Sequence, residues 1–218
     1  MRNLFYIVLL LFCQNIFCQD YIFDTLLEYT YSSTKKTNEG TLLFMINSKN
    51  NGYVFFLNAN KNDKSECSII DFNSKTQNCY KQTDENKFEY LCTQNKTPTF
   101  FLDENPNFKF EFDKEELDYN NSKIVITKFK INSNGKKKII DTIKIEIKKN
   151  NFVFNYNLLK FFSEKYFDDR DLSFLGDKTP KRILFEYKHG FKRTFELNKI
   201  EKINTTLTIT KEQLNYKQ

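Results

Sequence analysis

The chain has 218 residues, a formal net charge of +6 and a single histidine. Hydrophobic residues make up 39% and aromatic residues 17%, which is enough to build a core and argues against global disorder. The chain has only 5 Gly and 3 Pro, which excludes collagen-like and Gly-rich linker architectures. One imidazole also excludes a zinc site built from several histidines of one chain.

The N-terminus has the features of a cleavable secretory signal peptide. Residues 1–3 carry a positive charge, and residues 4–12 form an apolar run that is too short to span a bilayer. We expect cleavage after Cys18, so that 1–18 are removed and 19–218 form one exported β-rich domain, periplasmic or extracellular. Two alternatives stay open: an uncleaved N-terminal anchor, and a lipoprotein with its lipid on Cys18.

Two partner classes are not expected for the mature chain. No later segment is apolar for long enough to span a membrane. The mild positive charge does not indicate nucleic acid, and export would conflict with such a role.

The mature chain has the pattern of β-strands joined by tight turns. Asn-Gly between apolar runs is a strong hairpin signal and occurs at Asn51-Gly52 and Asn134-Gly135, and a third hairpin is predicted at His189-Gly190. The expected strands cover 25–31, 41–47, 53–57, 67–72, 78–82, 88–93, 108–112, 123–131, 138–148 and 206–210. The predicted fold class is therefore mainly β: an antiparallel meandering sheet, open or half-barrel, of roughly eight to eleven strands.

Two of these hairpins predict a register. If Asn134 and Gly135 are the loop residues, the facing pairs are Ile124 with Ile145, Ile126 with Ile143, Thr127 with Thr142, and Lys128 with Asp141. Apolar, Thr–Thr and opposite-charge pairs of this kind each stabilise a sheet by roughly 0.2–1 kcal/mol. The same rule applied at His189-Gly190 places Glu186 opposite Arg193 and Leu184 opposite Phe195.

One amphipathic helix is predicted over 157–167, packed on the sheet, because apolar side chains recur there at helical spacing. The sheet and helix form either a solid core or a cavity for an apolar ligand. In the second case the side chains that face the ligand are Leu158, Phe161, Phe162 and Tyr166.

Three cysteines follow the signal: Cys67, Cys79 and Cys92. Export permits a disulfide, and an odd number leaves one thiol over. We predict a bond between Cys79 and Cys92 across a turn at 83–86, with Cys67 as the alternative partner. Three small buried thiols are the other alternative.

No catalytic site, metal site or cofactor is predicted. His189 is placed at an exposed turn, whereas a general base needs a pocket and an orienting partner. Glycoside hydrolysis needs two carboxylates and no histidine. The candidate acids are Glu111, Asp113, Glu115, Glu116, Asp168, Asp169 and Asp171, and their spacing selects no pair. The acidic loop that also includes Asp177 lacks the spacing of a calcium-binding loop.

The charge is unevenly distributed along the chain. The charged residues in 101–120 are mainly acidic, and 123–149 are rich in lysine. Neighbouring strands are therefore expected to pair their charges. The alternative is a basic surface for an anionic glycan, lipid headgroup or polymer.

The function that follows is an exported, non-catalytic binding or interaction protein with a protein, glycan or lipid partner. A carrier of a hydrophobic ligand is the alternative, and a glycan-acting hydrolase is the third hypothesis.

Overall fold

The computed structural model describes residues 19–34, 39–59, 66–84, 87–94, 109–118, 120–149, 157–158, 162 and 178–209, and these residues form one antiparallel sheet of eleven strands. The strands are β1 (Gln19–Ser33), β2 (Gly40–Asn47), β3 (Asn50–Ala59), β4 (Glu66–Asp71), β5 (Thr76–Asp84), β6 (Lys87–Gln94), β7 (Lys109–Glu116), β8 (Asn121–Ile131), β9 (Lys137–Lys149), β10 (Lys178–Tyr187) and β11 (Lys192–Ile209). This confirms the prediction of a mainly β, antiparallel, open sheet.

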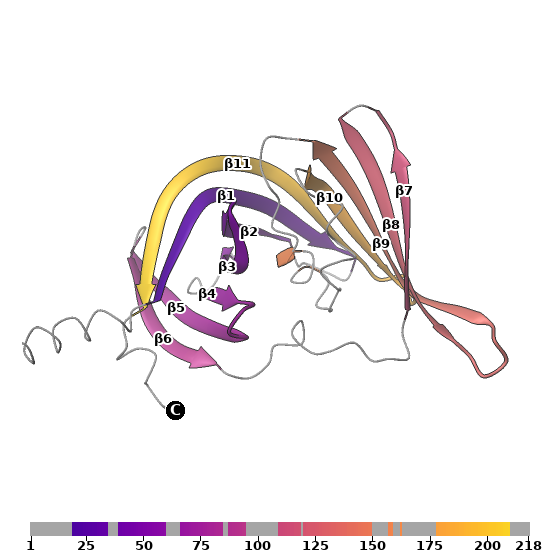
Figure 1. Cartoon of the computed structure of the whole chain (residues 1–218), viewed down its shortest axis with the longest axis horizontal. Helices are drawn as coiled ribbons and strands as arrows, with labels where there is room; N and C mark the ends of the chain where they lie inside the picture. Colours follow the sequence, from indigo (N-terminus) through magenta and orange to yellow (C-terminus); the bar gives the residue numbers. More distant parts are fainter. Residues whose placement is uncertain are drawn as a thin grey trace, which may run out of the picture.

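The first and last strands lie side by side in the middle of the sheet. The strand order is β6-β5-β4-β3-β2-β1-β11-β10-β9-β8-β7, so two meanders are joined by the pairing of β1 with β11. The outermost strands are β6 and β7. The sheet therefore has two wings, β2–β6 and β7–β10, on either side of the central pair (Figure 1).

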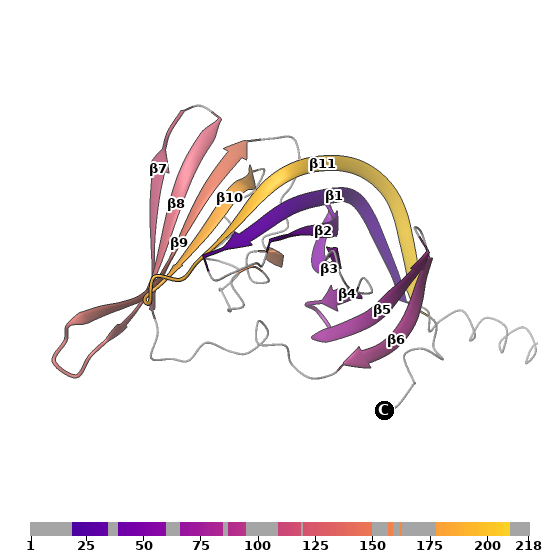
Figure 2. The same cartoon turned by 180° about the vertical axis from the view of Figure 1, so that it is seen from behind.

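The central pair is long and strongly curved. β1 has 15 residues and β11 has 18, and their pairing shifts between Phe23 and Thr25 and again between Glu28 and Tyr29. Bulges of this kind bend strands and increase their twist. The two strands accordingly form an arch, seen from both sides in Figures 1 and 2, with β2–β6 below the arch and β7–β10 standing beside it.

Two hydrophobic clusters stabilise the sheet. One lies between the wings and includes Leu27 and Tyr29 of β1 together with isoleucines of β8 and β9. The other joins Tyr21 and Phe23 of β1 to β3, β4, β5 and the end of β11. Side chains alternate between the two faces of a strand, and β3 accordingly places Val54 in the first cluster and Phe55 in the second.

The predicted amphipathic helix is not supported as an element of the fold. Most of 157–167 lies outside the described residues, and only Asn157, Leu158 and Phe162 are described, each with helical backbone geometry. Leu158 and Phe162 pack in the cluster between the wings. Within the described part of the chain, no helix is long and apolar enough to cross a membrane.

The predicted turn at Asn51-Gly52 is wrong. β2 and β3 are joined at Ser48 and Lys49, and Gly52 lies inside β3. The backbone N–H of Phe72 donates to the Gly52 carbonyl at 2.7 Å, and a Cβ on Gly52 would collide with the Asn73 side chain. This glycine therefore permits the β4–β5 turn to approach β3 closely, which is a tertiary requirement.

The predicted register of the β8–β9 hairpin is confirmed. Ile124 faces Ile145, and the other three predicted pairs also occur. The loop itself has three residues, Ser133–Gly135, with Gly135 at φ 75° and its N–H donating to the Asn132 carbonyl at 2.9 Å. A register shift between Lys128 and Phe129 compensates for the longer loop.

The predicted register at His189-Gly190 is wrong by one residue. Glu186 faces Lys192, and Ile183 faces Phe195. The loop again has three residues and ends in Gly190 at φ 76°, the pattern of a type I turn followed by a left-handed residue. No register shift between β10 and β11 compensates for the extra loop residue, so every facing pair moves by one.

Candidate binding surface

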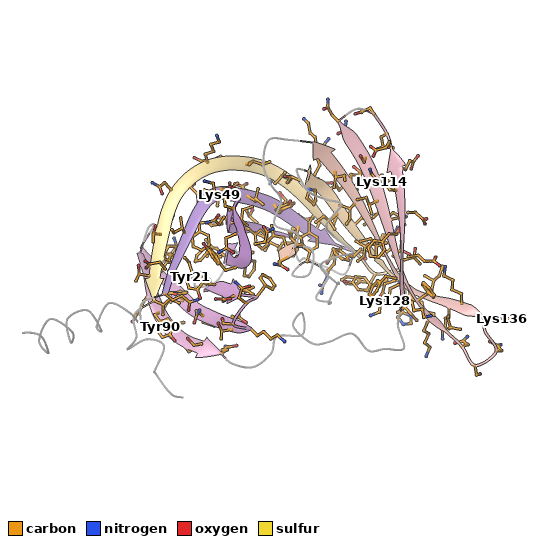
Figure 3. All side chains as sticks on the ribbon, viewed as in Figure 1. Tyr21, Lys49, Tyr90, Lys114, Lys128 and Lys136 are labelled. Atoms are coloured by element: carbon orange, nitrogen blue, oxygen red, sulfur yellow. The ribbon has the colours of Figure 1, made fainter. Side chains whose placement is uncertain are left out.

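The β8–β9 hairpin extends beyond the strands on either side of it. The pairing of β7 with β8 begins at Lys109 with Phe129, and the pairing of β10 with β9 ends at Tyr187 with Asp141. Residues 130–139 are therefore flanked by no described strand, and we call them the basic arm. Figure 3 shows the arm projecting from the sheet, with Lys128 near its base and Lys136 at its outer end.

The basic arm carries an uncompensated positive charge. Four of its ten residues are lysines and none is acidic. Lys137 pairs with Glu111 of β7, and its ammonium lies 4.3 Å from the centre of the Phe129 ring. Among the residues that the structure describes, Lys130, Lys136 and Lys138 form no ion pair. Within the described part of the chain, Lys130, Lys136 and Lys138 are therefore the lysines of the arm without an acidic partner.

Two of these lysines face each other. Lys130 is the cross-strand partner of Lys138. Like charges directly opposite each other destabilise a sheet, whereas opposite charges stabilise it. The arm thus contains an arrangement that opposes its own folding.

The arm also exposes apolar surface. Ile131 and Ile139 keep 50% and 56% of their surface accessible to solvent, and they are among the five large apolar side chains most exposed in the described residues. Ile139 faces Phe129, and Ile131 follows two residues later on β8, so all three side chains lie on one face. The facing pair Lys130 and Lys138 lies on the other face.

Several charged side chains elsewhere on β7–β11 form ion pairs between neighbouring strands. Lys123 pairs with Glu115 across β7 and β8, and Arg182 of β10 pairs with both Glu146 and Glu196. These contacts agree with the expectation that the acidic and lysine-rich segments neutralise each other. The basic arm of the same lysine-rich segment is less fully compensated, because Lys137 alone of its four lysines has a described acidic partner.

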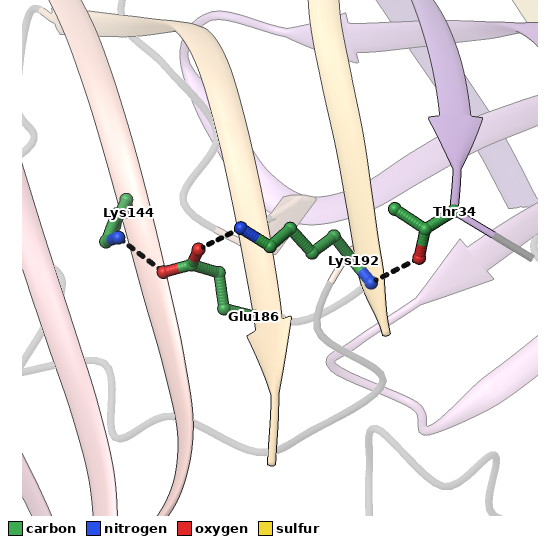
Figure 4. A network of polar contacts seen from close by, with 4 residues as sticks. All are labelled: Thr34, Lys144, Glu186 and Lys192. Carbon is green, nitrogen blue, oxygen red and sulfur yellow. Dashed lines mark hydrogen bonds and ion pairs between the residues drawn. The ribbon is translucent and has the colours of Figure 1, made fainter. Parts of the chain in front are cut away.

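Glu186 is the centre of the most extended of these contacts (Figure 4). Its carboxylate accepts from Lys144 of β9 and from Lys192 of β11, the latter at 2.8 Å, and the Lys192 backbone N–H donates to the Thr34 hydroxyl at 3.0 Å. Hydrogen bonds from Lys144 and then Lys192 hold the pKa of Glu186 below its ordinary 4.5. The ionised carboxylate thereby links three adjacent strands.

The predicted ligand-facing residues are in part core residues. Leu158 and Phe162 are 0% and 2% exposed. The Phe162 ring lies 5.1 Å from Tyr29, 5.2 Å from Phe44 and 4.6 Å from Phe195, measured between ring centres. Phe161 and Tyr166 lie outside the described residues. At Phe162 the space between the wings is filled by the chain's own side chains.

The cysteines occupy the positions that the predicted disulfide requires. Cys79 of β5 is the cross-strand partner of Cys92 of β6, and all three cysteines are reduced in the structure. Cys67 faces Tyr80, the residue after Cys79, so Cys67 and Cys79 point to opposite faces of the sheet. Burial raises the pKa of the Cys67 thiol to about 12, which keeps it protonated and a poor nucleophile.

The described residues that were considered for catalysis lie at exposed positions of the sheet. His189 is exposed at the β10–β11 turn. The β7 acids lie on an outer strand, where Glu111, Glu115 and Glu116 pair with lysines. The acids at 168, 169, 171 and 177 lie outside the described residues. In the described part of the chain, no three His, Cys, Asp or Glu side chains gather as a metal site requires.

Sequence reasoning missed a buried polar network beside β4. The Asp71 carboxylate, 3% exposed, accepts from Tyr21 O–H at 3.0 Å, from Gln19 at 2.8 Å and from two backbone N–H groups of the β4–β5 turn. Burial, followed by the nearby Asp71 charge, raises the pKa of Tyr21 above its ordinary 10.0. Gln19 and Tyr21 lie about fifty residues from Asp71 along the chain, so only the register of separate strands could reveal their contacts.

Asp71 serves the turn that it caps. Its Oδ1 accepts the backbone N–H groups of Asn73 and Ser74, which are otherwise unpaired donors of a tight turn containing Lys75 at φ 55°. The network therefore has a structural explanation.

Comparison with known proteins gives distant similarity only. No protein-family model and no curated protein matches the chain. PNGF-II, in its C2 space group, has a TM-score of 0.39 at 13% identity over 90% of this chain, and the P21 form has the same score over 84%. A DUF1329 family protein from Desulfovibrio piger has a TM-score of 0.25 at 11% identity, covering 90% of this chain and 91% of its own. The chain spans about 30% of the length of PNGF-II.

Proposed function

We propose that this protein is an exported, non-catalytic binding protein that contacts an anionic partner through the basic arm. The observation that carries this proposal is the facing pair of Lys130 and Lys138, which has no acid to neutralise it in the described residues. A repulsive pair on a projecting hairpin costs stability. A bound anionic partner would neutralise the two ammonium groups, so that the same charges attract the partner.

Export is part of the proposal and rests on the signal-like residues 1–18. The partner would then lie in the cell envelope or outside the cell. Electrostatic attraction of this kind weakens as salt screens it, with a Debye length of about 8 Å at physiological ionic strength.

Binding to envelope fragments of the producing host tests the proposal. The arm variant replaces three lysines together: Lys130→Gln, Lys136→Gln and Lys138→Gln. A matched control has the same net charge and replaces exposed lysines elsewhere: Lys49→Gln, Lys181→Gln and Lys202→Gln. We expect the wild type and the control to sediment with the fragments at low salt and the arm variant to stay in solution. Equal binding by both variants would refute the role of the arm.

A carrier of a hydrophobic ligand is the second candidate. The apolar wall between the wings favours it, because Ile124, Ile126, Ile143 and Ile145 line one face of β8 and β9. We also propose that 157–167 forms the helix over this wall, since Asn157, Leu158 and Phe162 have helical geometry. Native mass spectrometry of protein from its own host tests the carrier, which requires extra mass that disappears on denaturation.

A further inference from the structure

The chemistry of the basic arm selects among anionic partners. Protein–protein interfaces are enriched in Arg, Tyr and Trp and depleted in Lys. Residues 130–139 contain four Lys and no Arg, Tyr or Trp. Lysine is a flexible point charge suited to phosphate groups, and clusters of lysine attract anionic lipid surfaces.

Binding at a lipid surface also uses apolar side chains that enter the interface, and the two isoleucines of the arm can serve this purpose. Ile131 and Ile139 are about half exposed on one face of a thin two-stranded ribbon. Lysines at exposed strand edges also prevent pairing with other chains, so charge alone would not identify a partner. Exposed isoleucines on such an edge work against that protection, because they favour association. Apolar side chains next to lysines are the composition of segments that lie at a membrane interface.

We infer that the basic arm docks on an anionic lipid bilayer, with Ile131 and Ile139 entering the interface and Lys130, Lys136 and Lys138 attracted to the phosphate headgroups. This inference rests on the proposed function and names its partner. Lys130 and Lys138 lie on the face opposite the isoleucines. The field of an anionic surface extends over a Debye length of about 8–10 Å, and the long lysine side chains can reach toward the headgroups.

Co-sedimentation with lipid vesicles provides the direct test. The probe is a vesicle of phosphatidylcholine mixed with phosphatidylglycerol, compared with one of phosphatidylcholine alone. We expect wild type and the Lys49, Lys181 and Lys202 control to bind only the anionic vesicles. The arm variant should bind them roughly 100-fold more weakly, since each lysine near such a surface contributes about a factor of five.

A fluorescent reporter tests the isoleucines without removing any charge. The chain contains no tryptophan, so Ile139→Trp introduces a single fluorophore at the arm. We expect its emission to shift to shorter wavelength with anionic vesicles and to be quenched by brominated lipid. Ile22→Trp is the matched control, because Ile22 is 49% exposed on β1, outside the arm, and its emission should not change.

The outcomes separate the two proposals. Arm-dependent binding to envelope fragments without vesicle binding would refute the lipid and leave the proposed function standing, with a protein or glycan as partner. Vesicle binding that is equal in the two triple variants would refute the arm as the contact. Vesicle binding without a shift at Ile139→Trp would refute entry of the isoleucines into the interface.

Discussion

Around Phe162, rings from β1, β2 and β11 pack against one side chain that is 2% exposed, whereas in the basic arm Ile131 and Ile139 remain about half exposed. The contrast extends to charge. Glu186 is held by two lysines, while Lys130 faces Lys138. Both regions are antiparallel β-structure, so the difference lies in what covers the strands. The side chains of the core pack against one another, whereas those of the arm stay exposed.

Truncation of Phe162 should give the largest loss of stability. Phe162→Ala leaves a cavity among Tyr29, Phe44 and Phe195, and buried Phe→Ala changes cost about 3–5 kcal/mol. Chemical denaturation measures the free energy of unfolding. Ile139→Ala in the arm is the control and should change it by less than about 0.5 kcal/mol. Similar losses of unfolding free energy in the two variants would contradict the difference in packing between core and arm.

Oxidation of Cys79 with Cys92 should have the next largest effect, in the wing opposite the arm. A disulfide closing a loop of this length stabilises a protein by about 3 kcal/mol in the chain-entropy model. Peptide mapping identifies the bond, and denaturation with and without a reductant measures its effect. Cys67→Ser should preserve both results. A cross-link involving Cys67 would contradict the prediction.

Removing the hydroxyl from two tyrosines of the second cluster should change the free energy of unfolding by different amounts. Tyr21→Phe removes a hydrogen bond to the buried Asp71 carboxylate and should cost about 1.5 kcal/mol. Tyr80→Phe is the matched control, because the buried Tyr80 hydroxyl has no hydrogen-bond partner among the described residues. Its removal should be neutral or stabilising. Equal effects in thermal or chemical denaturation would show that the network has no specific role.

Acid should weaken the pairing at Glu186. Because the pKa of the folded state is below the ordinary 4.5, this stabilisation is present above pH 4.5 and is lost as the pH falls through the folded-state value. An exposed pair of this kind contributes less than about 1 kcal/mol. The stability difference between wild type and Glu186→Gln should therefore shrink in acid. A difference that is constant from neutral pH to strong acid would contradict this.

The smallest expected change in unfolding free energy is a gain of stability, from a substitution in the basic arm. Lys138→Gln removes the repulsion from Lys130 and should raise the free energy of unfolding by about 0.5 kcal/mol. Lys130→Gln should do the same, and the double variant should gain less than the sum of the two, because either change removes the one shared repulsion. Additive gains would mean that the two ammonium groups do not interact.

The sequence predicted the local pairing more accurately than the turns. The β8–β9 pairs follow from alternation along adjacent strands, which is a local property. The facing of Cys79 and Cys92 depends in addition on two register shifts between β5 and β6 that the sequence does not specify. The Asn51-Gly52 turn was misplaced because Gly52 serves contact with Asn73 instead. The His189-Gly190 register failed because a three-residue loop and a two-residue loop share the same glycine signal.

By itself, the sequence determined the strand content, the two glycine loops at Gly135 and Gly190, and the lysine excess of the arm, because alternation and turn chemistry are encoded within a few residues. Only the tertiary structure decided that β1 pairs with β11, that Tyr21 meets Asp71, and that residues 130–139 have no flanking strand among those described. These features join segments far apart in the chain. Their geometry depends on the curvature of the whole sheet, which no local pattern specifies.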